Sequence, residues 1–101
     1  MTTPWNYDNL AVIPASVPYS SSAGTVGTAS ALLLAANTKR SVVTVQNTHA
    51  SQTLYISATD PATVNDLAIV AGASMTMSPA PSNALYALGS GAATSYAILK
   101  G

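Results

Sequence analysis

The chain has 101 residues, the size of one ordinary domain, and 49% of them are hydrophobic while only 6% are charged. Three basic residues balance three acidic ones, which gives no electrostatic footprint for nucleic acid or for an anionic membrane. The absence of cysteine excludes disulfides and thiol chemistry. The apolar runs are too short to span a membrane, and the first residues do not have the pattern of a secretory signal. Because free monomers usually depend on surface charge for solubility, this composition favours a place in an assembly.

Residues 1–30 are predicted to form an extended N-terminal arm. Pro4, Pro14 and Pro18 interrupt this segment, and prolines exclude a long helix or a central strand. The segment nevertheless carries large apolar side chains, which a purely disordered tail would have in small number. The candidate partner-binding residues are Trp5, Tyr7, Leu10, Ile13 and Tyr19. Two interpretations stay open: the arm docks on a neighbouring chain, or it packs on its own domain as an edge strand.

Residues 31–101 are predicted to form one domain of short strands separated by turns. The expected strands and apolar runs cover residues 31–36, 41–47, 53–58, 67–70, 74–78, 84–88 and 94–99. Apolar runs at this spacing are typical of an all-β fold, here a small antiparallel β-sandwich that is jelly-roll-like or Ig-like. The strongest helical alternative is residues 30–36, because alanine and leucine are good helix formers.

Alternation within two of these strands predicts which side chains are buried. Val43 and Val45 are expected on the core face of one strand, and Leu54 and Ile56 share a face of the next. The two strands are predicted to pair as an antiparallel hairpin. Since the chain has no phenylalanine, its five tyrosines are expected to supply much of the aromatic bulk of the core.

Residues that carry chemistry are few. His49 is the only histidine, and its polar surroundings indicate a surface turn and not a nucleophile's base. Asp60 and Asp66 share one polar loop beside Pro61, where solvated turn residues are expected, so a catalytic carboxylate pair is a weak alternative. A calcium site with Thr63 and Asn65 is also weak, since the loop lacks the glutamate and the spacing of a calcium loop. We therefore expect no enzymatic activity, no catalytic residue, no cofactor and no metal.

The segment from Asn37 to Asn47 resembles small structural proteins of tailed bacteriophages. In those proteins a strand ending in Val-x-Asn is followed by a short connection and a Leu-Tyr-Ile strand, here residues 54–56. The Ala-Gly-Ala-Ser turn at 71–74 and the Leu-Tyr-Ala-Leu strand at 85–88 fit the same style. The likeness covers about residues 37–100 and implies a small β-sandwich whose role is contact, so no functional residue carries over from it.

This resemblance implies a capsid decoration (cement) protein on the virion surface, bridging neighbouring major capsid proteins. The expected partners are the major capsid protein or another virion protein, together with copies of the same chain, and neither nucleic acid nor membrane. A head-fibre, tail or neck component is the first alternative. A carbohydrate-binding module that uses Trp5 and exposed tyrosines is the alternative from another class.

Overall fold

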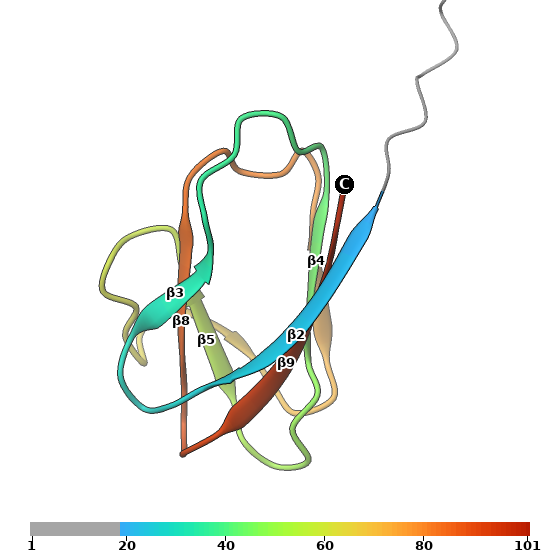
Figure 1. The fold of residues 1–101 in the computed structure, drawn as a ribbon. Coiled ribbons are helices and arrows are strands. Elements are labelled where there is room, and N and C mark those ends of the chain that lie inside the picture. Colours follow the sequence, from blue (N-terminus) through green and yellow to red (C-terminus); the bar gives the residue numbers. More distant parts are fainter. Residues whose placement is uncertain (1–18) are drawn as a thin grey trace, which may run out of the picture.

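The computed structural model describes residues 19–101, and every regular element in that range is a strand (Figure 1). The strands are β2 (Ser20–Val26), β3 (Ala31–Leu34), β4 (Val43–Asn47), β5 (Leu54–Ser57), β6 (Leu67–Ile69), β7 (Ser74–Met77), β8 (Leu85–Gly89) and β9 (Thr94–Lys100). The all-β prediction is confirmed, and the helical alternative for residues 30–36 is wrong. Pairing of β3 with β8 overrides the helix propensity of that alanine- and leucine-rich run.

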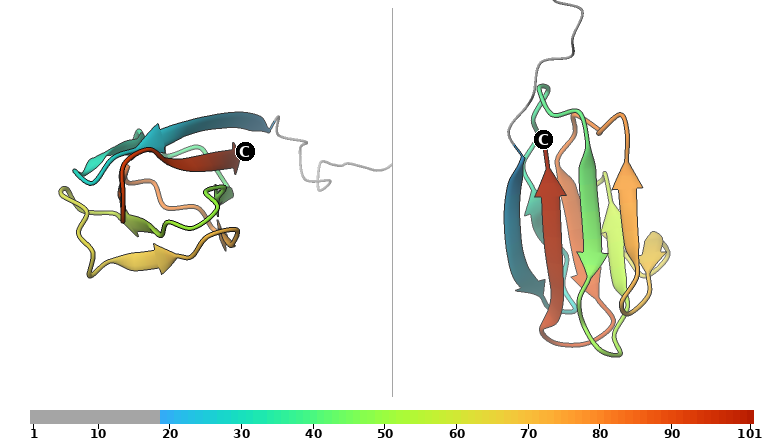
Figure 2. Two further views of the ribbon diagram at one scale, coloured as in Figure 1. Left: turned by 90° about the horizontal axis from the view of Figure 1, so that it is seen from below. Right: turned by 90° about the vertical axis from the view of Figure 1, so that its right-hand side faces the viewer.

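The strands form two four-stranded sheets, which pack face to face as the two layers of a sandwich (Figure 2). The first sheet has the order β2-β9-β4-β7 and the second has the order β3-β8-β5-β6. All neighbours are antiparallel, and the pairings nest: β2 with β9, β3 with β8, β4 with β7, and β5 with β6. This is the pattern of one long hairpin rolled into two sheets. Of the two expected sandwich topologies, the chain therefore adopts the jelly roll.

The predicted hairpin between residues 41–47 and 53–58 is wrong. β4 lies in the first sheet beside β7 and β9, whereas β5 lies in the second sheet beside β6 and β8. The polar connection between them crosses from one sheet to the other. The alternation was interpreted correctly, because Val43, Val45 and Leu54 are fully buried and Ile56 is nearly so. Alternation determines which face of a strand is buried, but not which strand lies beside it.

The sandwich begins earlier than residue 31. β2 falls inside the range 1–30 that was predicted as an arm, yet all seven of its residues pair with β9. Residues 20–26 therefore form an edge strand of their own domain. The three prolines of the first thirty residues all precede β2, so nothing in Ser20–Val26 prevents ladder hydrogen bonds.

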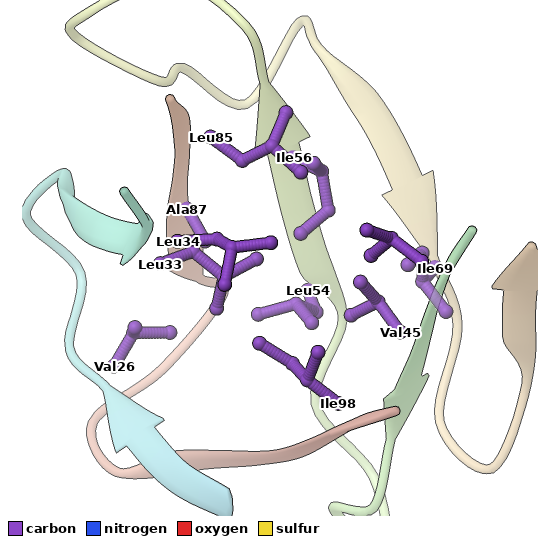
Figure 3. Close-up of a cluster of buried hydrophobic side chains, with 11 residues drawn as sticks. Val26, Leu33, Leu34, Val45, Leu54, Ile56, Ile69, Leu85, Ala87 and Ile98 are labelled. Atoms are coloured by element: carbon purple, nitrogen blue, oxygen red, sulfur yellow. The ribbon is translucent and has the colours of Figure 1, made fainter. Parts of the chain in front are cut away.

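The core lies between the sheets and is aliphatic (Figure 3). Its buried side chains are Val26, Leu33, Leu34, Val43, Val45, Leu54, Ile56, Ile69, Leu85, Ala87 and Ile98. Among the described residues the aromatic side chain that packs on this cluster is a tyrosine, the half-buried Tyr96, whereas Tyr55 and Tyr86 point to the outer side of the second sheet. A register shift between Leu32 and Leu34 turns two consecutive leucines, Leu33 and Leu34, into the core.

Candidate interaction surface

His49 lies in the connection between β4 and β5 and holds that turn together. Its Nδ1 accepts hydrogen bonds from the backbone N–H groups of Ser51 and Gln52, both at 3.0 Å. An imidazole nitrogen that accepts two backbone donors is unprotonated and occupied. The single histidine thus stabilises the turn between β4 and β5, in the connection where the sequence analysis expected a surface turn.

In the loop between β5 and β6 the carboxylate of Asp66 closes a turn. Oδ2 of Asp66 accepts the backbone N–H of Thr63 at 2.7 Å and the Thr63 hydroxyl at 3.2 Å. The backbone N–H of Asp66 donates in return to the Thr63 carbonyl at 3.1 Å. Within residues 19–101, no three histidine, aspartate or glutamate side chains gather where they could hold a metal ion. The contacts of Asp66 are thus those of a tight turn.

Arg40 binds two loops at one end of the sandwich, a role that the sequence analysis missed. Its guanidinium donates to the carbonyls of Pro81 at 2.9 Å, Ala35 at 2.7 Å and Asn83 at 2.6 Å. The planar fork of an arginine suits three divergent acceptors in this way. Two of the acceptors lie more than forty residues away in sequence, so no local pattern could reveal the contact.

Asn47 is a polar residue at a core position and links the two sheets. It is fully buried at the end of β4, and its side-chain amide donates to the carbonyls of Ile69 at 2.8 Å and Gln52 at 2.7 Å. Its Oδ1 accepts the backbone N–H of His49 at 3.0 Å. Here a sequence signal did exist, because Asn47 continues the inward alternation of Val43 and Val45. A polar residue at such a position indicates a buried hydrogen-bond network.

The outer face of the first sheet is the candidate interaction surface, and the right-hand view of Figure 2 shows this sheet face on. Strand alternation and the cross-strand register place on it Ser21, Ala23, Thr25, Thr44, Gln46, Ser74, Thr76, Ser95, Ala97 and Leu99. None of these side chains is charged. The hydroxyls of Thr44 and Thr76 hydrogen-bond to each other at 2.9 Å. Leu99, which is 42% exposed, is the largest apolar group of the face.

A shallow hollow lies at the centre of this face. Ala23 and Ala97 are cross-strand partners, and Gln46 on the next strand is the other partner of Ala97. Two methyl groups beside Gln46 and Leu99 leave an open depression of about 660 Å³. The depression is lined by Ser21, Ser22, Ala23, Thr44, Gln46, Ala97, Ile98 and Leu99. Its size suits small side chains of a partner, and no charged residue lines it.

The outer face of the second sheet differs in chemistry. Tyr86 lies between Leu32 and Ser57, and Tyr55 lies between Leu88 and Ala68 in the strand register. Both tyrosines are half-buried. This face is aromatic and more apolar, whereas the first is neutral and rich in hydroxyls.

Of the sequence-predicted partner residues, the structure describes Tyr19 alone; Trp5, Tyr7, Leu10 and Ile13 lie outside the described residues. Tyr19 is 56% exposed at the start of β2. Its ring covers Gly101, where an added Cβ would stand 2.7 Å from a ring carbon. Tyr19 thus sits at one end of the first sheet, beside the candidate interaction surface and not at its centre.

Comparison with protein-family models, with curated proteins and with solved structures gives no match for this chain. Residues 19–101 contain no helix that is long and apolar enough to cross a membrane.

Proposed function

We propose that this chain is a non-enzymatic structural protein of a virus particle, a decoration or cement protein that binds the outer shell and bridges neighbouring major capsid proteins. The observation that carries the proposal is the outer face of β2-β9-β4-β7, on which every side chain is uncharged. The sequence resemblance to small phage structural proteins supports the same role. The jelly roll is compatible with this role but does not decide it, since one fold supports many functions.

An uncharged face is suited to permanent contact for an energetic reason. A charged side chain that loses water at an interface must find a partner or costs several kcal/mol, whereas hydroxyl and methyl groups cost far less. A free monomer gains solubility from charges on such a face, and this chain has none there. The absence of charge thus favours a face that is permanently buried in an interface.

Copy number separates the proposed role from the other structural roles. The measurement is quantitative mass spectrometry of particles purified from the culture that produces the chain. We expect hundreds of copies per particle for a shell coat. Tens of copies would assign the chain to a fibre, tail or neck, and a chain that stays out of the particle fraction would overturn the proposal.

A matched pair of variants tests the face itself. Gln46 is exposed and lines the hollow, and Gln46→Glu adds one negative charge there with almost no change of shape, because the two side chains are nearly isosteric. Asn65→Asp makes the same chemical change on the exposed β5–β6 loop. We expect Gln46→Glu to weaken attachment to particles at least about tenfold, since the new charge is desolvated on binding. Equal attachment of the two variants would remove this face from the contact.

The outer face of the second sheet is the place to test the carbohydrate-binding alternative. Tyr55 and Tyr86 point outward from neighbouring strands, and aromatic rings are common stacking platforms for sugars. A glycan array probed with the purified chain, followed by Tyr55→Ala, decides this point. Glycan binding that Tyr55→Ala removes would favour the alternative over the shell role.

A further inference from the structure

The four edge strands of the two sheets are not equally protected against pairing with a strand of another chain. β6 has three residues, while β3 and β7 have four each. The pairing of β3 also shifts register between Leu32 and Leu34. β2 is the exception, because its seven residues pair with β9 without interruption and its other edge has no strand beside it among residues 19–101.

β2 also lacks the side chains that usually block an open edge. Proteins protect edges with short strands, charged residues, prolines or bulges, since unpaired N–H and C=O groups attract another strand. The sequence Ser20–Val26 contains no charge and no proline, and its pairing shows no bulge. Most of these residues are exposed. A long, regular, uncharged edge of this kind is suited to strand addition.

We propose that β2 pairs antiparallel with β2 of a second copy, about a two-fold axis at Ala23, and joins two sheets into one of eight strands. In this register Ser22 faces Gly24, Ser21 faces Thr25, and Ser20 faces Val26. In this register even-numbered residues face even-numbered residues and odd face odd. The N–H and C=O groups that point away from β9 on one copy therefore face the same kind of groups on the other copy and can hydrogen-bond to them.

The side chains of β2 favour a second copy as the occupant. Ala23 meets Ala23 at the axis, and the neighbouring serine, glycine and threonine side chains are small enough for close approach on both faces of the sheet. No like charges oppose each other, and the net charge of the chain is zero. The axis is perpendicular to the sheet, so the two candidate interaction surfaces become one continuous uncharged surface.

The contact is confined to one pair of strands, so it buries less than the roughly 1,200 Å² at the lower end of standard interfaces. We therefore expect a dimer that depends on protein concentration and is favoured where copies are crowded. The pairing is a property of the purified chain and does not depend on the proposed function, so the two can fail separately.

Disulfide trapping tests the axis. The chain has no cysteine, so Ala23→Cys in the full chain introduces a single thiol. Directly opposite residues of antiparallel strands have Cβ atoms about 4.5–5.5 Å apart, so a small approach of the strands reaches the roughly 3.5–4.5 Å of a disulfide. Ser74→Cys is the control, since Ser74 is exposed on the outer side of the other edge strand, β7. We expect Ala23→Cys to form a covalent dimer at least about tenfold faster than the control; equal rates would overturn the proposal.

A mixture of two variants tests the register. Ser21→Cys and Thr25→Cys are combined in equal amounts, oxidised and resolved by mass. The proposed pairing predicts the mixed dimer as the main product, because residue 21 of one copy faces residue 25 of the other. Dominant homodimers would overturn this register. Failure of Ala23→Cys to cross-link, while the β2 amides that point away from β9 stay protected from hydrogen exchange, would assign the edge to the chain's own residues 1–18 and would also overturn the proposal.

Discussion

Asn47 offers the sharpest test of what holds the two sheets together. The side chain is fully buried and satisfies three backbone groups: the carbonyls of Ile69 and Gln52 and the N–H of His49. Asn47→Ala removes these three hydrogen bonds, of which the bond to Ile69 is buried and those to Gln52 and His49 are partly buried. Each buried polar group left unsatisfied costs about 1–3 kcal/mol, so we expect a loss of about 3–5 kcal/mol in the free energy of unfolding. Domains of this size have about 5–15 kcal/mol in total.

The assay is urea unfolding followed by far-ultraviolet circular dichroism. The midpoint should fall while the slope stays constant, because the surface exposed on unfolding is nearly the same. A loss of about 3 kcal/mol corresponds to a decrease of roughly 12–24 °C in Tm for a domain of about 100 residues. Asn65→Asp, an exposed change in the β5–β6 loop, should stay within about 0.5 kcal/mol of the natural chain.

Asn47→Asp separates hydrogen bonding from volume. The ionised carboxylate keeps the size of the amide but has no donor for the two carbonyls, so we expect it to be less stable than Asn47→Ala at pH 7. Protonation restores one donor. The folded variant therefore binds a proton more readily than the unfolded chain, and its stability rises as the pH falls from 7 to 4. An Asn47→Ala variant within 1 kcal/mol of the natural chain would refute the reasoning.

Three further changes address other parts of the fold. In Gly89→Ala the new methyl overlaps the buried side chain of Thr94, so we expect the free energy of unfolding measured in urea to fall by about 3 kcal/mol or more. In the control Gly27→Ala the new methyl meets nothing within 4 Å, so stability should be nearly unchanged. Equal effects of the two variants would contradict the packing argument. Arg40→Lys keeps the charge but cannot reach three carbonyls at once, so the same assay should show a loss of about 1–2 kcal/mol, and an unchanged midpoint would mean that the loops do not need the guanidinium. Nitrogen-15 NMR at neutral pH should find His49 with its proton on Nε2, and a proton on Nδ1 would be incompatible with the turn.

Local pattern predicted the strands well and their neighbours poorly. Val43, Val45 and Leu54 are buried as the alternation requires, because a two-residue period has only one way to place apolar side chains on a core. Whether β4 pairs with β5 depends on how a long hairpin rolls up, which no single strand encodes. The resulting jelly roll separates two strands that are consecutive in sequence.

The candidate interaction surface was only partly predictable. Thr44 and Gln46 alternate with the predicted core residues Val43 and Val45, so their outward position follows from the same pattern. Ser21, Ala23 and Thr25 fell within the predicted arm because prolines interrupt the residues before them. Their place on the sheet depends on pairing with β9, some seventy residues later in the chain. The contacts of Arg40 are equally non-local, whereas Asn47 could have been found as a polar residue within a buried alternation.

The most direct test of the proposed shell role is a cryo-electron microscopy map of particles purified with this chain bound. We expect the jelly roll on the outer surface of the shell at junctions between major capsid proteins, with the outer face of β2-β9-β4-β7 in contact and Ala97 and Gln46 covered. Density at a fibre, tail or neck would contradict the shell assignment. A sandwich attached to the shell with this face turned to solvent would contradict the argument from its uncharged side chains.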